Sequence, residues 1–158
     1  MSAGSRLVPG DAPATTSRAA RWTGRTLSGL AVLFLVYDGL IKLDPNAPVE
    51  EAFAQLGVPL SSAARIGLLE LLCVLAYALP WTSTLGAVLL TGFLGGATAI
   101  HVRVGDPLWS HVLFPAYVGV LVWAGLILRD DRLRALLRPR TAAQRVPRES
   151  AAAGDAAR

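Results

Sequence analysis

The most restrictive feature of the chain is the stretch from residue 85 to residue 100, which has no polar face. Only two of its side chains, Thr91 and Thr98, carry a hydrogen-bonding group. A helix of a soluble protein needs a polar face toward water, whereas a helix surrounded by lipid does not. Because about 20 apolar residues suffice to span a bilayer as a helix, the stretch predicts a membrane-spanning helix.

Four segments of the chain are long and apolar enough for this role, covering residues 26–43, 63–81, 85–104 and 107–128. The composition agrees, because only 16% of the 158 residues are charged, compared with about 25% in a typical soluble domain. A soluble helical bundle is therefore disfavoured. We expect one all-α domain, residues 23–138, folded as an integral membrane four-helix bundle in contact with the lipid bilayer.

The charges that flank these segments predict how the chain is oriented. Arginines precede the first segment and follow the fourth, whereas the first loop, residues 44–62, contains acidic residues and no cation. Because Lys and Arg are enriched on the cytoplasmic side of membrane proteins, both termini are expected in the cytoplasm. The flanking cations are Arg18, Arg21, Arg25, Arg129, Arg132, Arg134, Arg138, Arg140, Arg145 and Arg148.

Nucleic-acid binding and secretion are both disfavoured by the placement of the charges. The net charge of +4 could attract nucleic acid, but the cations flank membrane segments without an aromatic reading platform, so we assign them to topology and anionic lipid head groups. Asp38 and Lys42 interrupt the first apolar segment, which argues against a cleaved signal peptide. Cys73 is the single cysteine and cannot form an intramolecular dithiol pair.

The chain ends and the connections differ from the apolar segments. Residues 1–22 and the basic residues 139–158 are predicted to be disordered cytoplasmic tails. Residues 48–56 predict a short extracytoplasmic helix at the membrane surface, because Pro48 can begin it and Gly57 can end it. We favour the interpretation that this short helix is a simple connector over the alternative that it covers a site below it.

The third segment and the turn that follows it contain two further signals, one for a helix start and one for helix packing. Asp106 is expected to cap the fourth helix, with Pro107 at its first position. Gly92 and Gly96 form a ridge of small residues that lets another helix approach closely. We favour a helix of the same bundle, rather than a helix of a second copy of the chain, as the one that packs against this ridge.

Ionisable residues of the four segments fall at similar depths. At the helical rise of about 1.5 Å per residue, Asp38 and Glu70 each lie about 9 Å below the outer ends of their segments. An ionisable side chain that faces lipid costs about 2.5 to 3.5 kcal/mol, so these groups are expected to face inward and pair. The candidate ligand-binding residues are Asp38, Lys42, Glu70, His101, Arg103 and His111.

The spacing also predicts how these residues pair. Asp38 and Lys42 are four residues apart and should meet on one helix face. Glu70 would then need another partner, and the candidates are Arg103, His101 and Arg65. Pro115 is expected to kink the fourth helix beside the cluster, which predicts a polar recess open to the outer side.

Two interpretations of this cluster remain. It is either an ion-pair network that fixes helix register or a site for a substrate, a proton or a quinone. Glu70 is the best candidate, because no cation lies within its own helical turn, and His101 is next, because imidazole titrates near neutral pH. A haem between His101 and His111 is disfavoured by their shallow position and charged neighbours. A metal site formed by Glu70 and the two histidines is equally disfavoured.

These residues occur within a recognisable pattern. The run LAVLFLVYDGLIKL at residues 30–43 and the segment from residue 66 to residue 137 resemble the DoxX-like family of small bacterial membrane proteins. The resemblance includes the Asp and Lys of the first segment, the Glu of the second, and the His-x-Arg-x-Gly-Asp-Pro turn after the third. It implies a compact four-helix bundle whose polar positions are Asp38, Lys42, Glu70, His101 and Arg103.

The resemblance also implies where to look for function, since some relatives are subunits of thiosulfate:quinone oxidoreductases or partners in oxidative-stress complexes. We expect a bacterial inner-membrane protein whose outward recess supports a quinone-linked redox complex or binds a small polar or amphipathic molecule. Glu70 and His101 would handle the protons of a quinone, and Lys42 and Arg103 its negative charge. A redox-protein partner would supply electrons. The alternative is a non-catalytic scaffold or assembly factor.

Overall fold

The computed structural model describes residues 17–137, and the regular structure in this range is entirely helical. The elements are α1 (Arg18–Leu43), α2 (Ala47–Gln55), a 3₁₀ turn η1 (Leu60–Ser62), α3 (Ala63–Ala78), α4 (Ser83–Val104), a π-helical turn η2 (Leu108–Val112), α5 (Phe114–Arg129) and α6 (Asp131–Leu137).

Four helical segments are long and apolar enough to cross a membrane, and they overlap the four predicted spans. They are Arg18–Leu43, Leu60–Ala78, Ser83–Val104 and Leu108–Arg129. Their outer faces are apolar: Leu33, Leu72 and Leu75, for example, are each more than half exposed. Since such a surface is suited to lipid rather than water, the all-α membrane bundle is confirmed.

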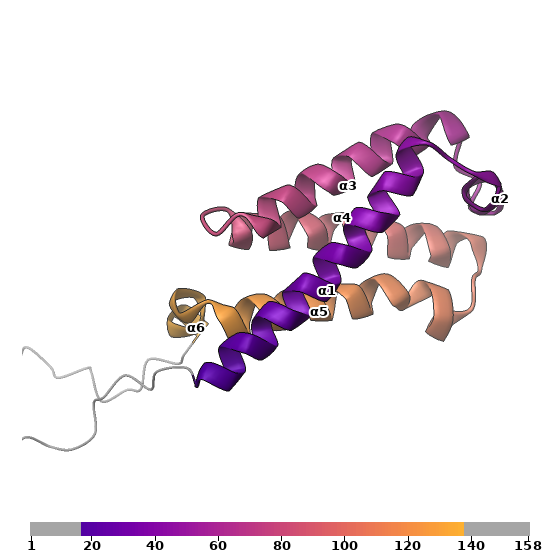
Figure 1. Ribbon diagram of the computed structural model, residues 1–158. Coiled ribbons are helices and arrows are strands. Elements are labelled where there is room, and N and C mark those ends of the chain that lie inside the picture. The colour runs from indigo at the N-terminus through magenta and orange to yellow at the C-terminus, as the bar shows by residue number, and fades with distance from the viewer. Residues whose placement is uncertain (1–16, 138–158) are drawn as a thin grey trace, which may run out of the picture.

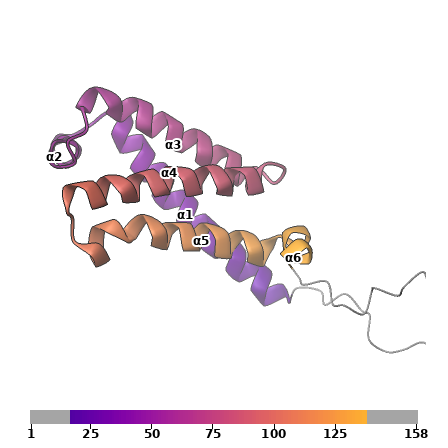
Figure 2. The same cartoon turned by 180° about the vertical axis from the view of Figure 1, so that it is seen from behind.

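The four long helices are not arranged symmetrically. α3, α4 and α5 lie side by side as one layer, and α1 crosses a face of this layer diagonally, in front of it in Figure 1 and behind it in Figure 2. The core lies between α1 and the layer and includes Leu35, Leu90 and Val122. α2 and the turn from α4 to η2 lie at one end, called here the α2 end, and the start of α1 and α6 lie at the opposite, terminal end.

Paired glycines allow the diagonal crossing of α1. Near the terminal end, a Cβ atom on Gly24 would lie 2.9 Å from the carbonyl oxygen of Gly125 in α5. Near the α2 end, a Cβ atom on Gly67 in α3 would lie 2.6 Å from the carbonyl oxygen of Gly39. The backbone of α1 therefore approaches α5 with one half and α3 with the other, as small residues permit in membrane helices.

The predicted close approach at Gly92 and Gly96 of α4 is wrong within residues 17–137. A Cβ atom on either glycine would have no atom within 4 Å. α4 instead approaches α3 at Gly86, where a Cβ atom would overlap the backbone of Tyr77. The short turn between α3 and α4 brings the two helices into this contact, so they form a tight antiparallel hairpin.

The side chain of Tyr77 connects three helices at the terminal end and is fully buried. Its hydroxyl donates to the Val122 carbonyl of α5 at 2.8 Å and lies 2.8 Å from the Ser28 hydroxyl of α1. Because the tyrosine has a single hydroxyl hydrogen, Ser28 is the donor in the second bond. Arg129 completes the contact by donating to the Tyr77 carbonyl at 3.1 Å.

The first helix begins earlier than predicted. α1 starts at Arg18, not at residue 26, so residues 18–22 of the predicted disordered tail are helical. The Ser17 side chain accepts a hydrogen bond from the Ala20 backbone at 3.2 Å and caps the helix. Hydropathy marks the hydrocarbon core and misses a helix that continues beyond it. The remaining predicted tails, residues 1–16 and 138–158, lie outside the described residues.

The fourth span differs from its prediction at its start. It consists of the π-helical turn η2 followed by α5, which begins at Phe114 with Pro115 in its first turn. A proline costs little there, because backbone N–H groups of a first helical turn have no helical partner. Pro115 therefore starts a helix and does not kink one. Asp106 also does not cap this span, because no side-chain cap bond is formed there.

Candidate functional site

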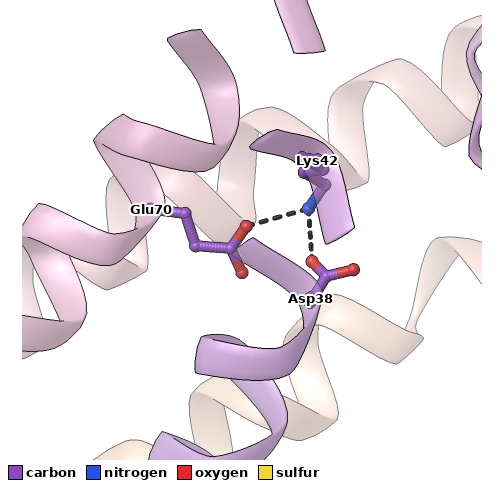
Figure 3. A network of polar contacts seen from close by, with 3 residues as sticks. All are labelled: Asp38, Lys42 and Glu70. Carbon is purple, nitrogen blue, oxygen red and sulfur yellow. Dashed lines mark hydrogen bonds and ion pairs between the residues drawn. The ribbon is translucent and has the colours of Figure 1, made fainter. Parts of the chain in front are cut away.

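The strongest polar cluster joins the end of α1 to the middle of α3. The Lys42 ammonium donates to Glu70 Oε2 at 2.8 Å and also contacts the Asp38 carboxylate. Figure 3 shows the lysine nitrogen between the two carboxyl groups. The close backbone contact at Gly39 and Gly67 lies next to these residues in both helices, so the crossing of α1 and α3 brings the three side chains together.

The predicted pair of Asp38 and Lys42 is present, but the predicted partners of Glu70 are wrong. Glu70 pairs with Lys42, which serves both acids, because an ammonium group has three N–H donors. The three predicted partners bond elsewhere: Arg103 donates to the Leu56 carbonyl at 2.5 Å, His101 pairs with Asp106, and Arg65 donates to the Ser61 carbonyl at 3.5 Å.

Charge and hydrogen bonding are unbalanced in this cluster. The Glu70 side chain has no exposed surface, whereas the side chains of Lys42 and Asp38 are 16% and 33% exposed. Two carboxyl groups face one ammonium, so the cluster carries a net negative charge unless one acid holds a proton. Glu70 Oε1 is buried without a hydrogen-bond partner in the described part of the chain. A buried acceptor without a partner typically lowers the free energy of unfolding by about 1 to 3 kcal/mol.

A cavity of about 640 Å³ lies against the cluster, within the usual range of about 300 to 1,000 Å³ for small-molecule sites. Its polar lining comprises Asp38, Lys42, Asn46, Glu70 and His101, and Tyr37, which also lines it, carries a hydroxyl group. The rest of its wall is largely apolar and comes from α1, α2, α3, α4 and α5, for example at Phe34, Phe53, Phe93 and Val118.

α2 forms part of this cavity wall through its inward face. Val49 and Phe53 are buried and line the cavity, and they also pack near Ala63 at the start of α3. The prediction of a short helix in the first loop is correct, with bounds shifted by one residue. The sequence favours a simple connector, but the structure places this helix against the cavity.

The six candidate residues separate into two groups. Asp38, Lys42, Glu70 and His101 line one cavity, whereas Arg103 and His111 are absent from its lining and are exposed. The rings of His101 and His111 are 6.0 Å apart between centroids. Within residues 17–137, no group of three His, Cys, Asp or Glu side chains is arranged to hold a metal ion.

Three further residues of the site were not predicted. Asp106 Oδ2 lies 2.6 Å from His101 Nδ1. Phe34 of α1 and Phe114 of α5 both line the cavity and meet edge to face, with ring centroids 5.4 Å apart. The position of Asp106 before Pro107 favours helix capping instead, and nothing in the local sequence indicates that the two phenylalanines meet.

Four apolar spans around an amphipathic cavity define a multi-pass membrane protein with a buried acid–base cluster. A family model described as the DoxX-like family matches residues 26–125, which extend from α1 into α5 and include the whole cluster. The chain therefore belongs to the DoxX-like family, as the sequence pattern predicted. None of the curated proteins and none of the solved structures compared with the chain gives a match.

Proposed function

We propose that the protein binds a lipid-soluble molecule whose polar head group donates hydrogen bonds, such as the hydroxyl groups of a quinol. The observation that carries this proposal is Glu70 Oε1, a fully buried acceptor in a cavity-lining residue with no partner in the described range. Asp38 lines the same cavity and is partly exposed. A hydroxyl or amine group of a ligand can satisfy such acceptors.

The cavity walls favour an amphipathic ligand over a fully polar one. Most of the lining is apolar, and the acids among its polar groups lie near the crossing of α1 and α3. Phe34, Tyr37 and Phe114 line the cavity, and each is more than a third exposed. A ligand dissolved in the bilayer would therefore reach the cavity between α1 and α5.

The head group is better matched by a hydroxyl than by a carbonyl. The Lys42 ammonium, the only Lys or Arg cation that lines the cavity from the described residues, donates to both acids and so uses two of its three N–H groups. Arg103 lies outside the lining and donates to the Leu56 carbonyl, so we do not assign it to the ligand. A quinol offers donors to the free acceptors, whereas a quinone offers only further acceptors. Electron transfer would require a redox-protein partner.

We further propose that the protein lies in a bacterial inner membrane with both termini in the cytoplasm. The described part of the terminal end carries six arginines, whereas the loop from residue 44 to residue 62 has no cation. The positive-inside rule then places the α2 end outside. The six arginines are Arg18, Arg21, Arg25, Arg129, Arg132 and Arg134.

Cysteine labelling in intact cells tests this orientation. Glu50→Cys and Arg132→Cys are each made in a Cys73→Ser background, which removes the single native thiol. An impermeant thiol reagent should label the first variant and leave the second unlabelled until the cells are opened. Labelling of Arg132→Cys alone would show that the orientation is the reverse of the proposed one. Labelling of both variants would contradict an arrangement in which the two positions lie on opposite sides of the membrane.

A non-catalytic scaffold is the second candidate function. The Lys42 bridge between α1 and α3 supports it, because an ion pair of this kind can fix helix register without any ligand. In that case the cavity would have no specific occupant, and removing the charge of Glu70 would change stability without changing any binding.

Binding to the purified protein in lipid nanodiscs separates the two functions. The probe is a decyl-substituted benzoquinol, kept reduced under anaerobic conditions and titrated by isothermal calorimetry. Glu70→Gln replaces the unpartnered acceptor Oε1 by an amide N–H group, so we expect the Kd to rise about tenfold, which corresponds to about 1.4 kcal/mol. Glu50→Gln is the matched control, because Glu50 is an exposed acid of α2 that does not line the cavity.

The melting temperatures of the variants complete this comparison. Weaker binding by Glu70→Gln with a nearly unchanged melting temperature supports the binding function. No saturable binding by the parent protein, together with a lower melting temperature for Glu70→Gln, supports the scaffold.

A further inference from the structure

The turn after α4 brings an acid onto a cavity-lining histidine. α4 ends at Val104, and the next residue, Gly105, has a φ of +77° in the left-handed region that glycine favours. The Asp106 backbone nitrogen then donates to the His101 carbonyl at 3.1 Å. This reversal places Asp106 Oδ2 2.6 Å from His101 Nδ1.

The contact determines the hydrogen-bonding role of the imidazole. An ionised carboxylate only accepts hydrogen bonds, so Nδ1 of a neutral His101 must carry the ring hydrogen. Nε2 is then an acceptor with a free lone pair. Nε2 has no hydrogen-bond partner within residues 17–137, and His101 lines the cavity.

We propose that Asp106 is a positioning residue that holds His101 in the tautomer whose Nε2 accepts a hydrogen bond from a hydroxyl group of the cavity ligand. This inference rests on the proposed function and narrows it. With His101 as a further acceptor in the cavity that Asp38 and Glu70 also line, the cavity prefers the reduced, hydroxyl-bearing form of a quinol/quinone pair.

The contact is not needed to form the turn itself. Two backbone bonds already close it, from Gly105 to the Val102 carbonyl and from Asp106 to the His101 carbonyl, both at 3.1 Å. The side-chain contact acts in addition on the imidazole, and its removal should alter ligand preference more than folding.

Asp106→Asn tests the proposal through the tautomer. An asparagine amide can donate to Nδ1, which allows the ring hydrogen to move to Nε2 and turns the acceptor into a donor. We expect the ¹⁵N NMR signals of His101 to show a protonated Nδ1 in the parent and a protonated Nε2 in the variant. His111→Gln in both backgrounds leaves His101 as the only histidine, so the signals are unambiguous.

Ligand preference provides the second measurement. The Kd values of the decyl-substituted benzoquinol and of its quinone are measured for the parent, for Asp106→Asn and for Asp106→Glu. We expect the parent to prefer the quinol, Asp106→Asn to shift the ratio of the two Kd values about tenfold toward the quinone, and Asp106→Glu to retain the parent preference. Asp44→Asn, the same change at an exposed acid of the same end, should have no effect.

The possible outcomes distinguish the positioning role from the proposed function. An unchanged tautomer and an unchanged Kd ratio in Asp106→Asn would overturn the positioning role, even if the parent binds quinol. If the parent binds neither form, the proposed function and the ligand preference both fail, whereas the NMR signals still decide whether Asp106 controls the tautomer.

Discussion

Lys42 Nζ lies 2.8 Å from Glu70 Oε2 and joins α1 to α3 where the two helices cross. The same ammonium contacts Asp38, one turn earlier in α1. A single cation thus contacts two acids in a region that faces both a cavity and the bundle interior. This arrangement makes stability depend on the lysine and leaves acceptor capacity for a ligand.

Replacement of Lys42 by methionine should be strongly destabilising. It keeps most of the side-chain volume but leaves Glu70, which is fully buried, without its cation. Breaking a buried ion pair from one side costs about 3 kcal/mol, and we expect a loss of this size in the free energy of unfolding measured by reversible SDS titration.

The matched variants are Arg65→Met and the double variant Lys42→Met/Glu70→Leu. Arg65 is an exposed cation that bonds within its own helix start, so its loss should have little effect. The double variant should recover much of the stability, because no charge remains at the fully buried position 70, and Asp38, which also loses Lys42, is partly exposed. Equal stability of the parent and Lys42→Met would show that the bridge does not hold the helices.

Two glycines of α4 should respond oppositely to alanine. At Gly86 the added Cβ would overlap the Tyr77 backbone, and such overpacking costs about 1 to 3 kcal/mol. At Gly92 the Cβ meets no atom within 4 Å, and alanine favours the helix by up to about 1 kcal/mol. Thermal melting of both variants checks this, and a destabilising Gly92→Ala would indicate an additional contact at that face.

The architecture was largely predictable from the sequence because it depends on apolar length. The span from residue 85 to residue 104 has few polar groups, and its ends are marked by Thr84 and Gly105. The start of α1 was missed because hydropathy does not register a helix that continues past the hydrocarbon. The contact at Gly24 and Gly125 was also missed, because it depends on the diagonal path of α1, which hydropathy does not contain.

The sequence predicted which residues form the site better than it predicted which of them pair with each other. Helix rise gave a common depth for Asp38 and Glu70, and both line the cavity. Depth does not say which helices touch, however, so the bridge from Lys42 to Glu70 was not predicted. The contact between Asp106 and His101 was missed for a similar reason, because a turn around Gly105 decides whether the acid points forward or back.

Arg103 should hold the loop that carries α2. Its guanidinium donates to the Leu56 carbonyl at 2.5 Å, next to Gly57 with a φ of +63°. Arg103→Ala should accelerate amide hydrogen exchange in α2 about fivefold, equivalent to about 1 kcal/mol of local stability. Arg65→Ala is the control at the same end, and identical exchange in both variants would exclude a specific role of Arg103.

Phe34 should control access to the cavity from the lipid. It meets Phe114 edge to face across α1 and α5, and both rings line the cavity. Phe34→Ala should raise the association and dissociation rates of the decyl-substituted benzoquinol by a similar factor, about threefold or more, with a smaller change in Kd. Leu33→Ala, at an exposed neighbour outside the lining, should leave both rates unchanged, and unaltered rates in Phe34→Ala would place the entrance elsewhere.

The most direct test of the proposed site compares two ligands that differ in hydrogen-bond donors. The Kd values of the decyl-substituted benzoquinol and of its dimethyl ether are measured with the same nanodisc preparation. Because a site with buried acceptors discriminates strongly against a ligand that lacks the matching donor, we expect the ether to bind at least about tenfold more weakly. Equal affinities would contradict the proposed site, because the acceptors of Glu70 and Asp38 would then contribute nothing to recognition.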